Sequence, residues 1–256
     1  MRTRARTDSA SFAVVVPAHN EEAGIRACVA AVDGVLAQLP NRTAIIVVDD
    51  GSTDATAAEL AEVEPSYQRL VVERHERNRG YGAALGTGAR SAAARDFEFV
   101  LFMDSDLTND PAYLPAFARL MDAGVDVIKA SRYAPGGGTV DVPRWRVAVS
   151  VLGNAVARLL YGLPIRDCTN GFRAVRTRLL SSMELHENGF AIIMEELYWL
   201  APLHASYAEV PIVLVSRGNH LRPSSFSFGL RSLARYLKYP ALTAVRRLRT
   251  TLRSGR

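Results

Sequence analysis

The apolar positions in the first half of the chain switch repeatedly between short continuous runs and a helical spacing. Continuous runs, which predict buried strands, occupy Phe12–Pro17, Ala44–Val48, Leu70–Glu73, Glu98–Met103 and Val125–Ala130. Helical spacing predicts helices from a cap at Asn20-Glu21-Glu22 to about Gln38, over Ala55–Val63, over Tyr81–Ala94, and onward from Asn109-Asp110-Pro111. Repeated strand–helix units predict an α/β fold with a mostly parallel sheet and helices on both of its faces.

After Ser131 this regular alternation ends. A glycine-rich loop follows at 135–139, where Pro135 precedes three glycines. The later pattern predicts an amphipathic helix with cationic ends over Arg144–Tyr161, a loop and short strand over Asp167–Val175, a helix over Ile192–Leu200, a strand over Ala208–Val215 and a helix over Ser225–Tyr239. We interpret this half as an extension of the first half and not as a separate domain.

Composition and cysteine usage narrow the class of protein. The chain has 256 residues, of which 48% are hydrophobic, enough for a sizeable core. No run of 18 or more apolar residues occurs, so no membrane-spanning helix is predicted. The basic N-terminal residues lack the apolar core of a secretory signal. Cys28 and Cys168 provide neither a disulfide framework nor a metal-binding spacing, so we expect a reduced, cytoplasmic setting.

The net charge of +5 hides a marked asymmetry along the chain. Residues 210–256 contain ten Lys or Arg and no acid, whereas the preceding part holds 21 basic and 26 acidic residues. A basic and partly apolar segment of this kind predicts peripheral contact with an anionic membrane, although a solvated helix with a disordered end is the alternative. No nucleic acid is expected, because no recognition motif accompanies the charge.

Two aspartates directly follow a predicted buried strand. Asp104 and Asp106 are one residue apart, so a strand continuing through them would place both on one face. Such neighbouring carboxylates repel each other unless a cation neutralises them, and Mg²⁺ or Mn²⁺ prefers oxygen ligands. The alternative is a solvated turn between a strand and a helix.

Three other polar loops also follow predicted strands. They are Pro17-Ala-His-Asn-Glu21, Asp49-Asp-Gly-Ser52 and Ser131-Arg-Tyr133. Because open α/β sheets bind ligands at the carboxyl ends of their strands, four such loops together predict one binding site. Asp49 could instead be a turn residue that accepts backbone amide hydrogen bonds, and Asp54 is expected to be a charge at a helix N-terminus.

Six motifs make the chain resemble glycosyltransferase family 2, which has the GT-A fold, and in particular its polyprenyl-phosphate branch. The motifs are Val14-Val-Val-Pro-Ala-His-Asn-Glu21, Val47-Val-Asp-Asp-Gly-Ser-Thr-Asp54, Arg79-Gly-Tyr-Gly82, Met103-Asp-Ser-Asp-Leu107, Ala130-Ser-Arg-Tyr133 and Asp167-Cys-Thr-Asn-Gly-Phe-Arg173. The resemblance implies one GT-A domain at 10–240, with a nucleotide-sugar-binding half at 10–133 and an acceptor-side half at 134–240, followed by a basic tail at 241–256.

The resemblance also implies roles for individual residues. Asp104, Asp106 and Arg132 would be catalytic, and the two aspartates would hold Mg²⁺ or Mn²⁺. The nucleotide-diphosphate sugar would be bound by Pro17, His19, Glu21, Val48, Asp50, Asp104, Ser105, Asp106, Arg132 and Arg217. Residues expected on the acceptor or phosphate side are Arg144, Asp167, Arg173, Glu195 and Arg222.

The expected reaction is inverting transfer of the sugar to a polyprenyl phosphate at the inner face of the cell membrane. A phosphate monoester is largely ionised at neutral pH and needs little base catalysis. The chain departs from the branch at Thr108, at Asn170 and in the Arg217–Ser225 segment, which lacks a lysine. An alternative acceptor is therefore a hydroxyl group of a saccharide or small molecule, with Glu195 or Asp167 as base. A catalytically silent nucleotide-binding scaffold is the alternative from another class.

Two further features receive a structural interpretation. Gly80-Tyr81-Gly82 resembles a dinucleotide-binding loop but does not directly follow a strand, so a dehydrogenase is not predicted. His75, His186 and His204 lack the spacing of metal ligands and are expected to be surface or packing residues.

Overall fold

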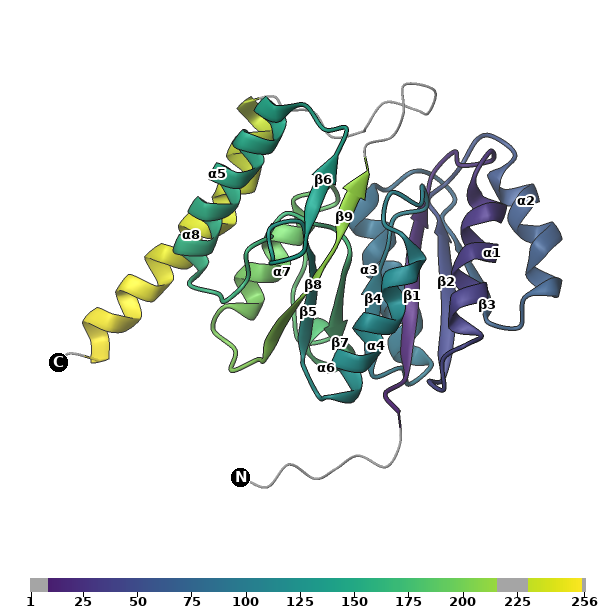
Figure 1. Cartoon of the computed structure of the whole chain (residues 1–256), viewed down its shortest axis with the longest axis horizontal. Helices are drawn as coiled ribbons and strands as arrows, with labels where there is room; N and C mark the ends of the chain where they lie inside the picture. The colour runs from purple at the N-terminus through teal and green to yellow at the C-terminus, as the bar shows by residue number, and fades with distance from the viewer. Residues whose placement is uncertain (1–8, 216–229, 255–256) are drawn as a thin grey trace.

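The computed structural model describes residues 9–215 and 230–254. Its main feature is a seven-stranded sheet with strand order β3-β2-β1-β4-β7-β5-β8 (Figure 1). The strands are β1 (Phe12–Ala18), β2 (Thr43–Asp49), β3 (Leu70–Arg74), β4 (Phe99–Phe102), β5 (Val127–Ser131), β7 (Arg173–Arg176) and β8 (Tyr207–Pro211). All neighbouring pairs are parallel except those of β7, which is antiparallel to both β4 and β5. The five strands expected in the first half of the chain and the mostly parallel sheet are confirmed.

Helices cover both faces of this sheet. The helices of the main body are α1 (Ile25–Leu36), α2 (Thr56–Val63), α3 (Tyr81–Ala94), α4 (Leu114–Asp122), α6 (Thr177–Leu180) and α7 (Ile192–Leu200), with short 3₁₀ turns η1 (Glu64–Ser66) and η2 (Pro111–Tyr113). Alternate residues of β1 point to opposite faces. Val14 therefore belongs to the core cluster with α1 and α4, whereas Val15 belongs to the cluster with α3 and α7.

The start of α1 differs from the expectation. No side-chain hydrogen bond caps this helix, which begins at Ile25 with Gly24 at the cap position. Asn20 and Glu22 act on the next loop instead, because the Asn20 Oδ1 accepts a hydrogen bond from the Thr53 amide and the Glu22 carboxylate accepts one from the Ala55 amide. The two polar residues thus join the first two loops at the edge of the sheet.

The strand expected over Ala208–Val215 is divided between two sheets. Proline has no amide hydrogen to donate to a sheet, and β8 ends at Pro211. Ile212 still donates to the Ser131 carbonyl, at 3.1 Å. The chain then leaves the main sheet, and β9 (Val213–Val215) pairs in parallel with β6 (Gly138–Val140).

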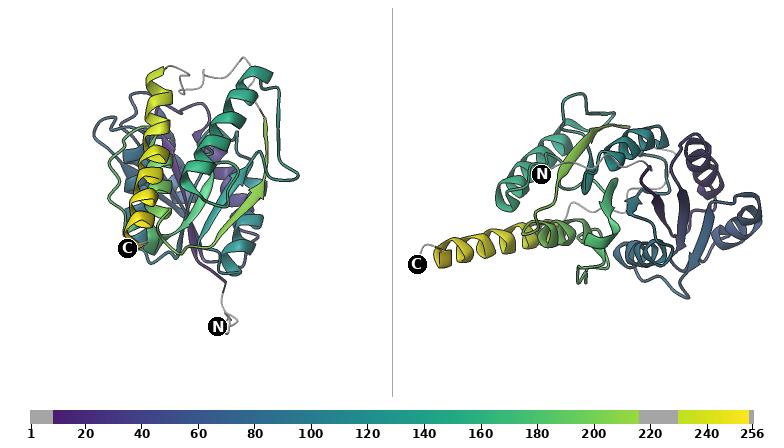
Figure 2. Two further views of the ribbon diagram at one scale, coloured as in Figure 1. Left: turned by 90° about the vertical axis from the view of Figure 1, so that its left-hand side faces the viewer. Right: turned by 90° about the horizontal axis from the view of Figure 1, so that it is seen from below.

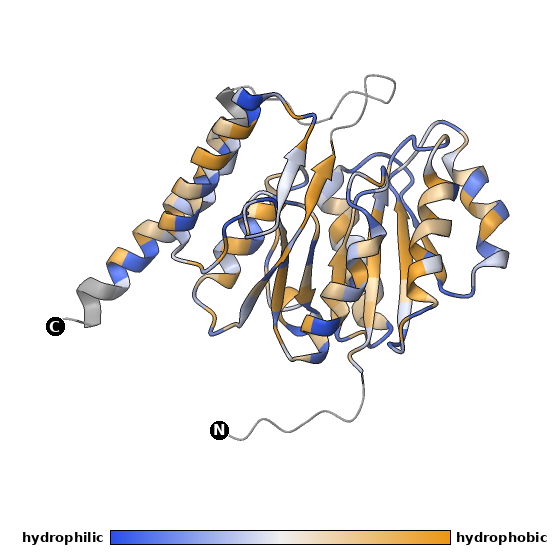
Figure 3. Ribbon diagram, in the orientation of Figure 1, coloured by the Kyte–Doolittle hydropathy of each residue, from blue (hydrophilic) through white to orange (hydrophobic). Residues whose placement is uncertain are grey.

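Two long helices lie side by side at one end of the molecule (Figures 1 and 2). Helix α5 spans Arg144–Tyr161, as expected, and α8 spans Leu230–Ser254. The helix expected to end at Tyr239 therefore continues through Pro240, and residues 225–229 lie outside the described ranges. Apolar and polar residues alternate along both helices (Figure 3). None of the helices in the described ranges is long and apolar enough to cross a membrane.

Candidate active site

The candidate site lies at the edge where the parallel strands end. The loops after β1, β2, β4 and β5 meet at this edge. Because β7 runs antiparallel to its neighbours, the segment that precedes it, residues 167–172, reaches the same edge. The sheet thus brings together all four predicted loops and the sixth sequence motif.

The two aspartates lie in the loop after β4 and not within the strand, because β4 ends at Phe102. The hydroxyl of Tyr81 donates to Oδ1 of Asp104 at 3.1 Å. Oδ1 of Asp106 accepts hydrogen bonds from the amide and the hydroxyl of Thr108, at 2.9 and 2.7 Å. Local hydrogen bonds, and not the alternation of a strand, therefore orient the acid pair. Both aspartates are half-buried.

The donor atoms of this pair suit a hard divalent cation. Within the described ranges, no group of three or more His, Cys, Asp or Glu residues could hold a metal ion. Mg²⁺ commonly binds through one or two carboxylates and takes further ligands from substrate phosphates and water, so two aspartates suffice. Asn109 is an independent indication of a cation site. Its buried Oδ1 accepts no hydrogen bond, and its Nδ2 lies 3.5 Å from Asp104.

Asp50 organises the loop that begins at Arg77. Its carboxylate accepts hydrogen bonds from the amides of Arg79 and Gly80, at 2.9 and 2.8 Å. His75 Nδ1 lies 2.6 Å from the same carboxylate, and its Nε2 lies 2.9 Å from the hydroxyl of Thr87. His75 is thus a buried part of the site's framework; the expectation of a packing residue missed its polar role.

The other residues expected to bind the nucleotide surround Asp50. Nδ1 of His19 can donate to the Asp50 carbonyl, which lies 3.0 Å away. Pro17 and Val48 are paired neighbours in β1 and β2, and Glu21 follows on the next turn. Val48 is buried, whereas Pro17, His19 and Glu21 are half-buried.

Two aspartate side chains fix the turn between β2 and α2. Oδ1 of Asp49 accepts the Ser52 amide at 2.9 Å, which is the expected turn interaction. Asp54 accepts the Thr56 amide at 3.0 Å, at the start of α2, as expected for a charge at a helix N-terminus. Burial raises the Asp54 pKa, but hydrogen bonds from Thr56 outweigh this and leave the pKa lowered.

Arg132 and Asp167 form a buried ion pair between the end of β5 and the segment 167–172. Nε and Nη2 of Arg132 lie 2.7 and 2.9 Å from the two carboxylate oxygens. Burial disfavours the charged form of Asp167, but the hydrogen bonds and charge of Arg132 outweigh it and lower the Asp167 pKa. The hydroxyl of Thr169 also accepts from Arg132 at 3.0 Å. Ser105, which lies between Asp104 and Asp106 in the loop after β4, is also buried.

Two buried cations hold the segment 167–172 by its backbone. Nζ of Lys129 donates to the Asn170 carbonyl at 2.8 Å, and Nη1 of Arg173 donates to the Gly171 carbonyl at 2.8 Å. Arg173 also pairs with Glu196 through two hydrogen bonds of 2.7 and 2.6 Å. Arg173 is 0% exposed, so it lies in the core beneath the site, away from the surface position that a phosphate ligand requires.

Lys129 was not predicted from the sequence. It is 0% exposed, and burial, followed by the charge of Arg173, lowers its pKa to about 8. A single lysine within the pattern of a predicted strand does not indicate that its side chain is buried. Glu196 was expected as part of a helix face or, with Glu195, as a possible base, and it is buried against Arg173.

Arg144, Glu195 and Arg222 are the other residues expected on the acceptor or phosphate side. Glu195 is 2% exposed, and its carboxylate accepts the amides of His186 and Glu187 at 2.9 and 2.8 Å. Arg144 is exposed at the first residue of α5. Arg217 and Arg222 lie outside the described residues.

Comparison with known proteins identifies the family. The model of glycosyl transferase family 2 matches residues 13–183. The chain belongs to this family. It is 32% identical over 228 residues to a polyprenol monophosphomannose synthase of Mycolicibacterium smegmatis, with 83% of each chain covered. It is 29% identical to a dolichol-phosphate mannosyltransferase of Pyrococcus furiosus, over 88% of this chain and 63% of that protein.

Solved structures agree with the assignment. The fold of this glycosyltransferase is similar to that of glucosyl-3-phosphoglycerate synthase from Mycobacterium tuberculosis in complex with UDP, with a TM-score of 0.64 and 25% identity. The match covers 90% of this chain and 80% of that one. The same synthase in complex with Mn²⁺, UDP and phosphoglyceric acid gives a TM-score of 0.63. The predicted GT-A fold and glycosyltransferase activity are therefore confirmed.

Proposed function

We propose that this glycosyltransferase moves a mannosyl group from a nucleotide-diphosphate sugar to a polyprenyl phosphate at the membrane surface. The main support is the set of hydrogen-bond partners of Asp167 and Glu195, the two carboxylates that could serve as base for a hydroxyl acceptor. Asp167 is paired with Arg132, and Glu195 accepts two backbone amides. Neither carboxylate is poised to take a proton, which favours an acceptor that is already ionised, such as a phosphate monoester. The similarity to a polyprenol monophosphomannose synthase and to a dolichol-phosphate mannosyltransferase favours the same kind of acceptor.

In this proposal, Asp104 and Asp106 hold Mg²⁺ or Mn²⁺. The cation would neutralise the negative charge that develops on the departing nucleoside diphosphate. The chain's own part is to keep the two carboxylates oriented, through Tyr81 and Thr108, and to place cationic side chains near the reacting anions. Arg132 is the described arginine best placed for this, because Asp167 fixes its guanidinium at the end of β5.

Contact with the membrane is supported by an exposed apolar stripe on α5. Its members recur every three or four residues and therefore share one helix face. The exposed fraction reaches 67% for Leu152 and 77% for Leu159. The α5 stripe consists of Trp145, Val149, Leu152, Val156 and Leu159. Large apolar side chains aligned on one exposed face suit insertion into the interfacial region of a bilayer.

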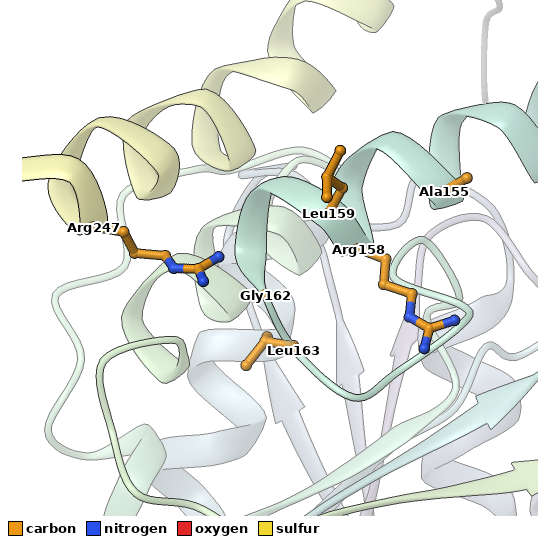
Figure 4. Close-up of a pocket in the computed structure, with 6 residues that line it drawn as sticks. All are labelled: Ala155, Arg158, Leu159, Gly162, Leu163 and Arg247. Atoms are coloured by element: carbon orange, nitrogen blue, oxygen red, sulfur yellow. The ribbon is translucent and has the colours of Figure 1, made fainter. Parts of the chain in front are cut away.

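Helix α8 adds positive charge beside the α5 stripe. Leu248 is exposed, and Arg246, Arg247 and Arg249 are exposed next to it. A hollow of ≈ 510 Å³ lies at the end of α5 and is lined by Arg158 and Leu159 of that helix and by Arg247 of α8 (Figure 4). Each cation near an anionic surface contributes about 1 kcal/mol to binding. The negative potential of the cytoplasmic leaflet then places the enzyme at the inner face of the membrane.

The acceptor is tested by product analysis. Labelled GDP-mannose, UDP-glucose and other nucleotide sugars are incubated with Mn²⁺ or Mg²⁺ and with polyprenyl phosphate, 3-phosphoglycerate or oligosaccharides. We expect an organic-soluble product that appears only with polyprenyl phosphate. Transfer to a soluble hydroxyl acceptor alone would refute the proposed acceptor, and full turnover without any divalent cation would refute the metal site.

Membrane contact is tested separately by vesicle sedimentation. Replacing Leu152 and Leu159 with glutamate should reduce binding to anionic vesicles, because it removes apolar area and adds repulsion. Leu203→Glu is the matched control, since Leu203 is also an exposed leucine but lies outside the α5 stripe. Equal sedimentation of all variants would refute the assigned surface, and concentration-dependent dimers lost in the double variant would show that a second copy covers it.

A further inference from the structure

Asn154 is a buried polar residue on the inner face of α5. It is 2% exposed and shares this face with Ala157 and Tyr161, the other buried residues of the helix. The α5 stripe lies on the opposite face, because its members are displaced from Asn154 by about half a turn. Burying a carboxamide costs free energy unless its donors and its acceptor are paired, so the partners of Asn154 indicate its role.

The carboxamide of Asn154 holds the start of the segment 167–172. Its Oδ1 accepts hydrogen bonds from the amides of Cys168 and Thr169, at 2.7 and 3.2 Å. Backbone amides only donate, so they fix which end of the carboxamide faces them. The Nδ2 donates to the Ser150 carbonyl at 2.9 Å and to the Thr169 hydroxyl at 3.1 Å. Two of these four hydrogen bonds therefore orient Thr169.

Thr169 connects Asn154 to Arg132. The Thr169 hydroxyl oxygen accepts hydrogen bonds from Nδ2 of Asn154 at 3.1 Å and from Nη2 of Arg132 at 3.0 Å. With both lone pairs engaged, the hydroxyl proton is directed to Oδ1 of Asp167, which lies 3.3 Å away. The same carboxylate accepts Nε and Nη2 of Arg132, so the guanidinium, the carboxylate and the hydroxyl form one closed network.

A second contact joins α5 to the loop that carries Arg132. The hydroxyl of Tyr133 donates to the hydroxyl of Ser150 at 2.7 Å, and Ser150 lies one turn before Asn154. The guanidinium carbon of Arg132 lies 5.2 Å from the centre of the Tyr133 ring. Helix α5 thus supports Arg132 through Thr169 and through Tyr133 on its inner face, and carries the α5 stripe on its outer face.

We propose that Asn154 is a positioning residue for the reaction: through Thr169 it holds the guanidinium of Arg132 in the orientation that faces the reacting anions. The ion pair with Asp167 sets the distance between two side chains, and the link through Thr169 to α5 adds a third fixed point. Small displacements of a group that stabilises developing charge cost large factors in rate. The inference rests on the role of Arg132 in the proposed function, but it depends neither on the sugar nor on the identity of the acceptor.

The first measurement follows Arg132 itself, without donor or acceptor. Exchange of the Arg132 Nε–H proton with water is measured by ¹⁵N NMR, and the signal is assigned by its loss in Arg132→Lys. Asn154→Ala and Thr169→Val should each speed this exchange about fivefold, because a hydrogen bond that supports the guanidinium is lost. Thr169→Ser keeps the hydroxyl and should retain the wild-type exchange rate.

Asn41→Ala is the matched control for the loss of a buried asparagine. Asn41 is 7% exposed, and its Nδ2 donates to the Ala10 carbonyl at 2.8 Å and to Oδ1 of Asp122 at 3.1 Å. It precedes β2 and therefore lies at the edge of the sheet opposite the site. Its replacement should lower the melting temperature, as that of Asn154 should, but leave the Arg132 exchange and the rate of transfer unchanged.

The second measurement is mannosyl transfer from GDP-mannose to polyprenyl phosphate with Mn²⁺. Asn154→Ala and Thr169→Val should each lower kcat by about tenfold to a hundredfold. In an Arg132→Lys background the same substitutions should cause no further loss, because they act through Arg132. A role limited to stability predicts instead the same fractional loss in both backgrounds.

The outcomes separate this inference from the proposed function. Unchanged exchange of Arg132 in Asn154→Ala and Thr169→Val would overturn the inference, as would wild-type kcat in both variants beside a lowered kcat in Arg132→Lys. Wild-type turnover in Arg132→Lys would remove Arg132 from the proposed function, and the positioning role with it. If the wild type transfers no mannose to polyprenyl phosphate, the proposed function falls, and the exchange measurement still decides whether Asn154 places Arg132.

Discussion

Replacing Lys129 with methionine should change the pH dependence of stability in a defined direction. Lys129 is 0% exposed, and its ammonium faces Arg173, Glu196 and Asp167. Its pKa in the folded protein is about 8, compared with 10.5 for an ordinary lysine. Between these two values the unfolded chain binds a proton that the folded protein has lost, so stability rises with pH. Below pH 8 both states are protonated, and the cost of burying the charge is fully present.

The magnitude follows from the two pKa values. Between pH 7 and pH 9 the wild type should gain about 1.3 kcal/mol in free energy of unfolding relative to Lys129→Met, because each pH unit in this window contributes about 1.4 kcal/mol. Burial raises the pKa of both Cys28 and Cys168 to about 12, which lowers stability above pH 9. That effect is present in both proteins and largely cancels in the difference.

The assay is urea unfolding, followed by circular dichroism, of both proteins at pH 7, 8 and 9. Lys238→Met is the control, because Lys238 is the chain's other lysine and is exposed. With only two lysines, ¹³C-lysine labelling also gives two resolvable signals, so the titration of Lys129 can be observed directly. A stability difference that stays constant from pH 7 to pH 9 would refute the reasoning.

Three further changes have defined outcomes. Asp106→Asn should reduce transfer about a thousandfold or more without lowering the metal-free melting temperature, because a like charge next to Asp104 is removed; normal turnover would contradict this. Gly88→Ala should destabilise by about 1–3 kcal/mol in urea, since its Cβ would lie 2.3 Å from Val15, and Val15→Ala should restore part of the loss. Arg132→Gln should cost about 3–5 kcal/mol at neutral pH, because it removes the ion-pair partner of the buried Asp167. Because the Asp167 pKa is lowered in the wild type, that loss should shrink as pH falls below about 4; a loss independent of pH would argue against the pair.

Elements with a strong local pattern were predictable from the sequence. The bounds of α3, α5 and α7 match the expected ranges, because apolar spacing and flanking breakers act locally. The prediction that Asn20 caps the first helix was wrong, because its side chain accepts a hydrogen bond from a loop that is distant in sequence. The predicted end at Tyr239 was wrong, because the amphipathic pattern and the helix both continue through Pro240.

The site was predictable where it depends on loops that follow parallel strands, and less so where it depends on long-range burial. Asp104 and Asp106 were expected at the sheet edge and lie there. Arg173 was expected to reach a phosphate, but its partner Glu196 is 23 residues away and draws it into the core. His75 and Lys129 gained their roles only through burial against distant groups. A single sequence does not contain such pairings in a form that spacing rules detect.

The antiparallel strand β7 has a consequence for the order in which the protein folds. β4 and β5 do not pair with each other; each pairs with β7, which enters between them from a later part of the chain. The first 133 residues therefore leave β5 without either of its neighbours, β7 and β8. During synthesis, β4 and β5 can be joined in one sheet only after residue 176 has emerged, so the loops after β1, β2 and β4 are not fixed against the segment 167–172 before that point. A fragment ending at 133 should behave as a folding intermediate with an open sheet edge and not as an independent nucleotide-binding domain.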